Sequence, residues 1–134
     1  MTMFDENVRT ALATAKNLYV ATERKDGSRS DAAPIWFMAD DAAVWFTTVP
    51  TSWKAKRVRL GRPLHVHVGS RSGAYFKGRG TIVTDPAVAV RMAPVYAARY
   101  WLAWLGFFRP NPERVRTGKT VIVRVVPWQN QSPS

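Results

Sequence analysis

The sequence predicts a mainly β domain of the α+β type, in which a six-stranded antiparallel sheet curls towards a small barrel and helices flank it. Two observations support this fold class. Short apolar runs with strand-like composition recur along the chain, separated by turn signals rich in Gly, Pro, Asp and Ser. Helical patterns interrupt these runs at few points, so most consecutive strands are joined by short turns, which favours antiparallel pairing.

The first elements expected are a helix followed by three strands. Apolar residues recur at helical spacing over residues 4 to 16, which predicts an amphipathic helix. Residues 17 to 22 form an apolar run that predicts the first strand, and a hairpin turn signal follows at residues 25 to 28. We expect the second strand at residues 32 to 38 and the third at residues 43 to 48.

The middle of the chain predicts a basic helix and two further strands. Residues 51 to 60 lead from hydroxyl side chains into a short helix rich in Lys and Arg. The alternating run from 64 to 68 predicts the fourth strand. Turn residues 70 to 73 then lead into a longer fifth strand at residues 74 to 83.

A strong helix start follows the fifth strand. Asp85 is a typical N-cap residue, and Pro86 suits the first helical position. We expect this helix to continue to about Leu105, with Gly106 as its C-terminal cap. The last strand is expected at residues 120 to 126.

Length and composition limit the possible functions. The chain has 134 residues, and we expect one domain over residues 1–128 with a flexible polar tail at residues 129–134. It contains no Cys and two His, which excludes thiolate nucleophiles and zinc-thiolate sites and leaves few metal ligands. The N-terminus shows no signal-peptide pattern, so the expected location is the cytoplasm. The net charge of +11 suits nucleic acid, anionic lipid or small polyanionic ligands alike.

The junction between the third strand and the basic helix predicts a phosphate site. Thr47 and Thr48 end the strand, Ser52 precedes the helix, and Lys54 and Arg57 follow with a spacing of three. Hydroxyl groups, the amide groups of a helix start and cationic side chains all favour an oxyanion. The spacing allows Lys54 and Arg57 to reach the same oxyanion.

Three other interpretations of these motifs have to be weighed against the phosphate site. The basic residues, including the second pair Lys56 and Arg59, could form one solvated helix face. Thr51-x-x-Lys54 has the spacing of an acyl-transfer pair, but the other elements of such a site are missing. His65 and His67 share one strand face and could chelate a metal, but no third ligand is evident, so no metal site is expected.

In this order, the motifs resemble the split β-barrel family of flavin- and deazaflavin-binding proteins related to pyridoxamine 5'-phosphate oxidase. The resemblance covers roughly residues 4 to 127. It rests on these motifs: Val20-Ala21-Thr22 before Asp26-Gly27, Ala33-Pro34-Ile35-Trp36-Phe37, Trp45-Phe46-Thr47-Thr48, Ser52-Trp53-Lys54-Ala55 with Arg57, Arg62-Pro63, and Gly78-Arg79-Gly80.

The resemblance implies a cofactor, FMN or the deazaflavin coenzyme F-420, and a homodimer with cofactor clefts between its subunits. It implies that the backbone around Pro34, Ile35 and Trp36 lines the isoalloxazine ring. The residues it implies for the ribityl phosphate are Thr47, Thr48, Ser52, Lys54 and Arg57.

One departure narrows this resemblance. The oxidases proper often carry two adjacent basic residues after the serine, whereas this chain has Trp53 before Lys54. The chain is also short and lacks a long C-terminal substrate segment. Both features favour the small relatives that bind FMN or the deazaflavin over pyridoxamine phosphate oxidase activity itself.

The aromatic segment from Tyr96 to Phe108 allows three interpretations. Its residues recur at helical spacing and suit a core or a dimer interface. Trp101 and Trp104 could instead wall an apolar substrate pocket over the cofactor. Aromatic rings flanked by Arg could also make weak peripheral contact with a membrane. The uncharged stretch is far shorter than the ~20 residues of a membrane span, so no transmembrane segment is expected.

We therefore predict a flavin- or deazaflavin-dependent oxidoreductase that transfers hydride to or from a small, apolar or conjugated substrate. The cofactor would carry the chemistry, which fits a chain with no evident catalytic side chain. The alternative is a basic binding module without catalysis, which would carry a flavin cofactor or bind nucleic acid. Nucleic acid is not expected, because most aromatic residues occupy positions that alternate or repeat as core.

Overall fold

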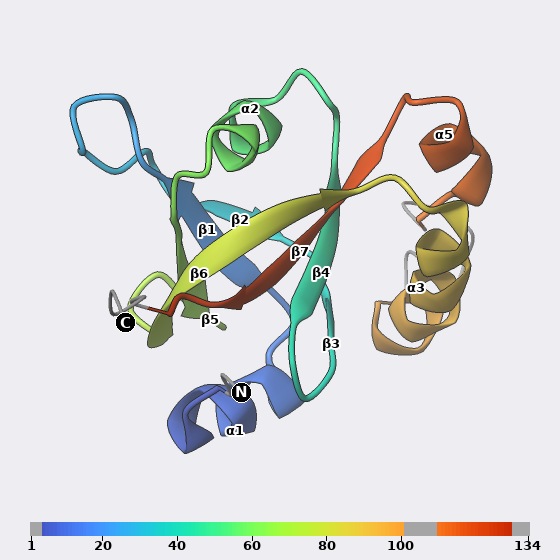
Figure 1. The fold of residues 1–134 in the computed structure, drawn as a ribbon. Helices are drawn as coiled ribbons and strands as arrows, with labels where there is room; N and C mark the ends of the chain where they lie inside the picture. Colours follow the sequence, from blue (N-terminus) through green and yellow to red (C-terminus); the bar gives the residue numbers. More distant parts are fainter. Residues whose placement is uncertain (1–3, 101–109, 130–134) are drawn as a thin grey trace.

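The computed structural model describes residues 4–100 and 110–129, and within them one curled antiparallel sheet dominates (Figure 1). The sheet has seven strands in the order β2-β1-β5-β6-β7-β4-β3. The predicted fold class, a mainly β domain with a curled antiparallel sheet, is therefore confirmed, with seven strands where six were expected. The strands are β1 (Leu18–Thr22), β2 (Ala33–Ile35), β3 (Met38–Ala39), β4 (Val44–Thr48), β5 (Leu64–Val68), β6 (Ala74–Val83) and β7 (Val121–Pro127).

The extra strand arises because the run expected as one strand at residues 32 to 38 is two. β2 pairs with β1, β3 pairs with β4, and these two short strands lie at opposite edges of the sheet. Only Trp36 and Phe37 join them, so the edges can lie no more than about 11 Å apart along the chain. The sheet must therefore curl until its two edges lie close together. We call the two-residue link, Trp36 and Phe37, the crossover; it bridges the gap between the two edges of the barrel.

Tyrosine hydroxyls replace strand partners at this crossover. The Tyr96 hydroxyl donates to the Trp36 carbonyl oxygen at 2.8 Å, and the Phe37 amide donates to the Tyr100 hydroxyl oxygen at 3.2 Å. Buried backbone groups need such partners. The chain can thus leave one edge of the sheet and reach the other without a ladder.

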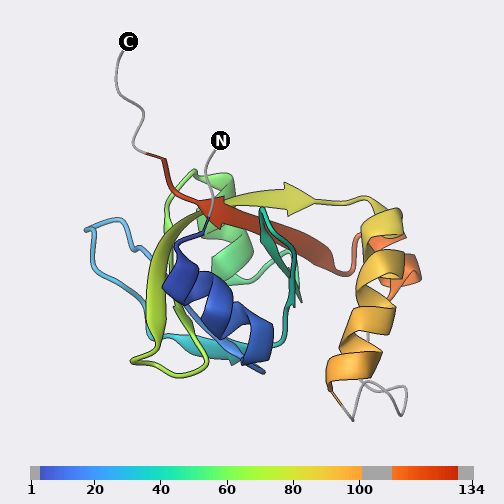
Figure 2. The same cartoon turned by 90° about the horizontal axis from the view of Figure 1, so that it is seen from below.

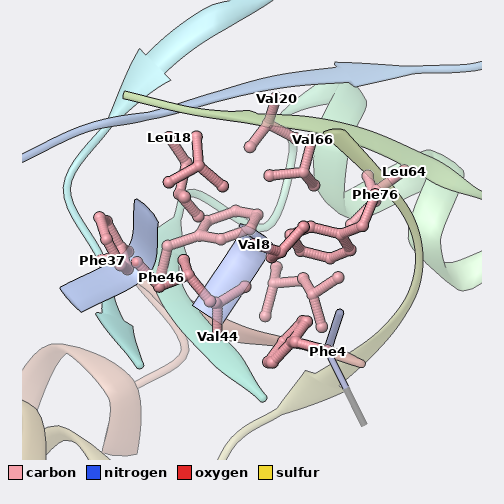
Figure 3. Packing of buried hydrophobic residues seen from close by; sticks show 14 of the residues in the cluster. Phe4, Val8, Leu18, Val20, Phe37, Val44, Phe46, Leu64, Val66 and Phe76 are labelled. Atoms are coloured by element: carbon pink, nitrogen blue, oxygen red, sulfur yellow. The ribbon is translucent and has the colours of Figure 1, made fainter. Parts of the chain in front are cut away.

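The barrel interior is filled by alternate residues of the strands (Figure 3). Phe37 from the crossover and Phe46 from β4 are both fully buried there. Phe4 packs edge-to-face on Phe76, with ring centroids 5.0 Å apart. This cluster includes Phe4, Val8, Leu18, Val20, Phe37, Val44, Phe46, Leu64, Val66, Phe76, Val123 and Val125.

Helices α1 (Glu6–Thr14) and α2 (Trp53–Arg59) close opposite ends of the barrel (Figures 1 and 2). α2 buries Ala55 and Val58, and Val58 packs directly on β6 at Gly80. A Cβ on Gly80 would lie 2.9 Å from a Val58 methyl carbon, so the close approach of α2 depends on this glycine. The basic helix predicted from the sequence is thereby confirmed.

Helix α3 (Pro86–Arg99) packs on the outer face of the β3-β4-β7 side and forms a second core. Asp85 caps its start as predicted, accepting a hydrogen bond from the Ala87 amide at 2.9 Å. The expected extension to Leu105 is wrong, because the helix ends at Arg99 and Tyr100 is extended. The Tyr100 hydroxyl donates to the Lys16 carbonyl oxygen at 2.6 Å, which holds the residue away from the helical path.

Two further differences concern short elements. Helix α5 (Pro112–Arg116) was not predicted, although Asn111 followed by Pro112 is a helix start of the same kind as at α3. The first strand begins at Leu18, one residue later than expected. Gly106, the expected C-cap, lies outside the described residues, and no helix among those described is long and apolar enough to cross a bilayer.

Candidate functional site

The start of α2 is organised by hydroxyl groups, as the sequence motif indicated. The Ser52 Oγ atom accepts the Ala55 amide hydrogen at 3.1 Å and the Thr48 hydroxyl hydrogen at 2.9 Å. Because both lone pairs of Ser52 Oγ are then used, its own hydroxyl proton remains for another acceptor. The end of β4 and the start of α2 are thus locked together.

Lys54 and Arg57 face a cavity of about 390 Å³ between α2 and the β1–β2 hairpin. The structure therefore brings together the two cations that the i, i+3 spacing predicted. The three hydroxyl residues predicted for the same site, Thr47, Thr48 and Ser52, do not line this cavity. The lining residues are Val20, Thr22, Arg24, Ser30, Asp31, Trp53, Lys54 and Arg57.

The Arg57 side chain makes two defined contacts but leaves one hydrogen-bond donor without an acceptor. Its Nη1 atom donates to the Thr22 hydroxyl at 2.9 Å, and its guanidinium carbon lies 4.6 Å from the centroid of the Trp53 ring. Its Nε atom is buried and has no hydrogen-bond partner among the described residues. A buried donor without an acceptor costs free energy, so this atom indicates a missing acceptor.

Lys54 is a second uncompensated cation. Burial lowers the pKa of its ammonium group, since desolvation disfavours the charged form. Within residues 4–100 and 110–129, no carboxylate pairs with it. Asp31 lines the same cavity, but Arg24, Lys54 and Arg57 outnumber it. The cavity therefore favours an anionic guest.

A second cavity, of about 460 Å³, lies at the barrel crossover. It brings together the residues that the resemblance assigned to the cofactor ring, and Thr47 belongs here. Its lining consists of Asn17, Pro34, Ile35, Trp36, Thr47 and Tyr96.

Two tyrosines of α3 and its end set the shape of the crossover cavity. The Tyr100 ring stacks on Trp36 with centroids 4.2 Å apart and planes within 4° of parallel. Tyr96 packs edge-on to both rings. Burial raises the pKa of the Tyr96 and Tyr100 phenols, so both stay neutral hydrogen-bonding groups at ordinary pH.

Both cavities border the same pair of strands. Pro34 of β2 is opposite Tyr19 of β1, and β1 continues through Val20 to Thr22. Pro34 lines the crossover cavity, whereas Val20 and Thr22 line the cavity beside α2. A ligand with an aromatic ring at one end and an anion at the other could follow this strand pair.

Several residues of these cavities were not predicted. Tyr96 began an aromatic segment with three open interpretations, Thr22 belonged to a motif of the resemblance without a role of its own, and Asn17 carried no functional signal. They reach the site through long-range packing, which spacing along the chain does not reveal. Trp101 and Trp104, expected at a substrate pocket, lie outside the described residues.

The two histidines occupy a polar outer face of the sheet. His65 is buried, with its Nε2 atom 2.6 Å from a Glu23 carboxylate oxygen and its Nδ1 atom 2.7 Å from the Tyr75 hydroxyl. His67 Nδ1 lies 3.0 Å from the Gly73 carbonyl oxygen. Both nitrogens of His65 are thus engaged, and the described part of the chain contains no cluster of three or more His, Asp or Glu side chains that could hold a metal ion.

A comparison with family models decides the relationship that these features suggest. The model of pyridoxamine 5'-phosphate oxidase matches residues 4–129. The chain belongs to this family. A comparison with curated proteins found no match.

Solved structures share the fold at low sequence identity. An F420 reductase is 21% identical with a TM-score of 0.62, and the match covers 94% of this chain and 97% of that chain. The general stress protein 26 from Bacillus anthracis is 18% identical with a TM-score of 0.64, covering 91% and 87%. HutZ, the haem storage protein from Vibrio cholerae, is 12% identical with a TM-score of 0.64, covering 97% and 93%.

Proposed function

We propose that this member of the pyridoxamine 5'-phosphate oxidase family binds FMN or the deazaflavin coenzyme F-420 and acts as an oxidoreductase. The reaction would be hydride transfer to or from a small, apolar or conjugated substrate. The observation that carries the proposal is that two cations, Lys54 and Arg57, line one cavity beside the aromatic crossover. The buried Nε atom of Arg57 has no hydrogen-bond acceptor among the described residues. The two cavities suit the two ends of such a cofactor.

The cavity beside α2 would hold the cofactor phosphate. An oxyanion there would give the Arg57 Nε atom its acceptor and would neutralise Lys54, whose charge burial disfavours. Such charge-assisted hydrogen bonds are about twice as strong as neutral ones. The Thr22 hydroxyl fixes the Arg57 guanidinium, so little side-chain freedom remains to be lost on binding.

The crossover cavity would hold the ring. When bound, a flavin or deazaflavin supplies the hydride chemistry, and the protein orients and shields it. Pro34, Ile35 and Trp36 would form the wall against the ring, and Tyr96 would hold that wall through the Trp36 carbonyl. The predominance of apolar and aromatic side chains supports an apolar or conjugated substrate.

A homodimer is part of the same proposal and is implied by the family resemblance. Mass measurement by light scattering would test it, with one particle of twice the chain mass as the expected result. A monomer that binds cofactor would remove the dimer from the proposal and leave the cofactor site standing.

A second candidate is a cofactor carrier without catalysis. It is favoured by the lining of the crossover cavity, where the described residues include no carboxylate, imidazole or amine. Proton transfer in a catalytic cycle would then depend on the substrate or on water. The two candidates share the binding site and differ only in turnover.

Cofactor binding is tested by titrating FMN and the deazaflavin into apoprotein and following cofactor fluorescence. Saturation by at least one of them at micromolar concentration, with about one site per chain, is the expected result. No change with either cofactor would contradict the proposal. For the cofactor that binds, reduction followed by a panel of conjugated electron acceptors distinguishes an oxidoreductase, which reoxidises it in a protein-dependent way, from a carrier, which does not.

A further inference from the structure

The outer side of α2 carries large apolar side chains that the barrel does not bury. Trp53 and Leu60 are each 65% exposed, and Val49 in the preceding loop is 49% exposed. Trp53 and Leu60 are seven residues apart, so they point to the same side of the helix. The opposite side already buries Ala55 and Val58 against the sheet. The exposed apolar groups are therefore not needed for packing within the chain.

Two exposed cations flank these apolar groups. Lys56 and Arg59 are exposed, and the Lys56 ammonium lies 5.0 Å from the centroid of the Trp53 ring. Arg59 donates to the Pro50 carbonyl oxygen at 2.8 Å, which keeps it beside the loop that carries Val49. We call the surface formed by Val49, Trp53, Lys56, Arg59 and Leu60 the α2 face.

The charge around this face has one sign over a long stretch. No Asp or Glu occurs between Asp41 and Asp85, whereas this stretch contains many Lys and Arg. A partner with distributed negative charge would therefore meet mainly cations, since Asp31, across the cavity that Trp53 lines, is outnumbered by the Lys and Arg around it. Isolated exposed apolar residues need no explanation, but Trp and Leu framed by cations on one helix side are the pattern of helices that lie in a membrane interface.

We propose that the α2 face docks on the surface of an anionic lipid bilayer. Trp53 and Leu60 would enter the interfacial layer, and Lys56 and Arg59 would contact lipid headgroups. Because Trp53 also lines the cavity beside α2, docking would bring the rim of that cavity to the bilayer. Apolar molecules dissolved in the membrane could then approach the molecule without crossing water. The docking itself does not depend on the proposed oxidoreductase function.

The size of the effect follows from the charges. A Lys or Arg near an anionic surface contributes about 1 kcal/mol at moderate salt, or roughly fivefold in the partition constant. Replacing both Lys56 and Arg59 with Gln should thus weaken binding to an anionic bilayer roughly 30-fold. Leu60→Gln should weaken it through the loss of apolar contact instead, with little change in salt dependence.

The first test is sedimentation of the protein with vesicles of neutral phosphatidylcholine, with and without phosphatidylglycerol. We expect binding to the anionic vesicles only, reduced in the variants Lys56→Gln with Arg59→Gln and in Leu60→Gln. The matched control is the double variant Arg9→Gln with Lys119→Gln, which removes two exposed cations elsewhere. Its binding to anionic vesicles should fall much less. Absence of binding to anionic vesicles, or equal losses in both double variants, would overturn the proposal.

The second test uses the absence of native Cys. Leu60→Cys creates a unique thiol for an environment-sensitive dye, and Val90→Cys, at a residue 57% exposed on α3, gives the control. We expect a blue shift with anionic vesicles at position 60 and none at position 90. If the label at position 60 responds to single-stranded oligonucleotide and not to vesicles, the face recognises a nucleic acid and the membrane proposal is wrong.

Discussion

The two cavities on the β1–β2 side are built in opposite ways. The cavity beside α2 takes two of its three cations, Lys54 and Arg57, from one short helix, and it selects its ligand mainly by charge. The crossover cavity takes its shape from β2, β4 and the distant helix α3 with the residue after it. Tyr96 of α3 and Tyr100 beyond its end hydrogen-bond to residues about sixty positions earlier. The cation pair of the first cavity is thus brought together by local sequence, whereas the shape of the second exists only after the barrel has closed.

This difference predicts how each region fails. Loss of the Lys54 cation beside α2 should weaken ligand binding without harming the fold, because burial already disfavours that charge. Loss of a tyrosine at the crossover should harm the fold first and the site as a result.

Tyr100→Ala should have the largest effect. The change removes a buried ring stacked on Trp36 and the hydroxyl bonded to Lys16 and Phe37. Removing a large buried aromatic side chain costs about 3–5 kcal/mol. Urea unfolding should show a loss of this size. Val90→Ala, on the exposed side of α3, is the control and should change the free energy of unfolding by less than about 0.5 kcal/mol.

Lys54→Met and Arg57→Met should separate binding from stability. A charge-assisted hydrogen bond contributes about 1.5–3 kcal/mol, so each change should weaken cofactor binding roughly 10- to 150-fold. Apoprotein stability should stay the same or rise in Lys54→Met, since a partly desolvated charge is removed. Fluorescence titration and thermal unfolding of the same samples measure both quantities.

A double-mutant cycle sharpens this prediction. If Lys54 and Arg57 contact one oxyanion, their effects should couple by more than about 0.5 kcal/mol. Arg59→Ala is the control on the same helix, since Arg59 bonds to Pro50 and does not line the cavity. Equal small losses from all three single changes would mean a diffuse basic surface, and the phosphate site would have to be abandoned.

Tyr96→Phe should have a smaller effect confined to the crossover. It keeps the ring and removes the hydrogen bond to the Trp36 carbonyl, a change of about 1 kcal/mol in the free energy of unfolding. Calorimetry should detect it as a modest fall in melting temperature. Binding of inorganic phosphate beside α2 should not change. A parallel loss at both cavities would show that they are one cooperative unit.

The pH dependence of the cavity beside α2 should be the subtlest effect. Burial lowers the pKa of Lys54 in the ligand-free protein, and a bound phosphate would raise it. Cofactor affinity should therefore be highest below the pKa of Lys54 in the ligand-free protein. It should fall as the pH rises from there towards the pKa of Lys54 in the complex. Over the window between the lowered pKa and the ordinary one, the unfolded chain binds more protons, so apoprotein stability should rise with pH. Lys54→Met should lose both trends.

The elements that sequence reasoning found are those whose signal is local. The caps at Ser52 and Asp85 and the strands β5 and β6 have residue types that act on their nearest neighbours, and they were predicted within a residue or two. Lys54 and Arg57 belong to the same class, because three residues along a helix suffice to bring them together.

The elements that it missed depend on distant partners. A continuous apolar run hid the break at Trp36 and Phe37, because the tyrosines that satisfy this backbone come from α3 and the residue that follows it. The early end of α3 has the same origin, since Tyr100 leaves the helix to reach Lys16 and Phe37. Helical spacing continued beyond this point in the sequence and gave no warning.

The two-residue crossover also affects how the molecule opens. In most sheets the two edge strands fray independently and each offers unpaired amides to other chains. Here β2 and β3 are consecutive in the chain and meet across Trp36 and Phe37, so neither can peel away without pulling on the other. Amide hydrogen exchange should therefore report one cooperative opening for both edges, and their joint enclosure should protect the chain against edge-to-edge aggregation.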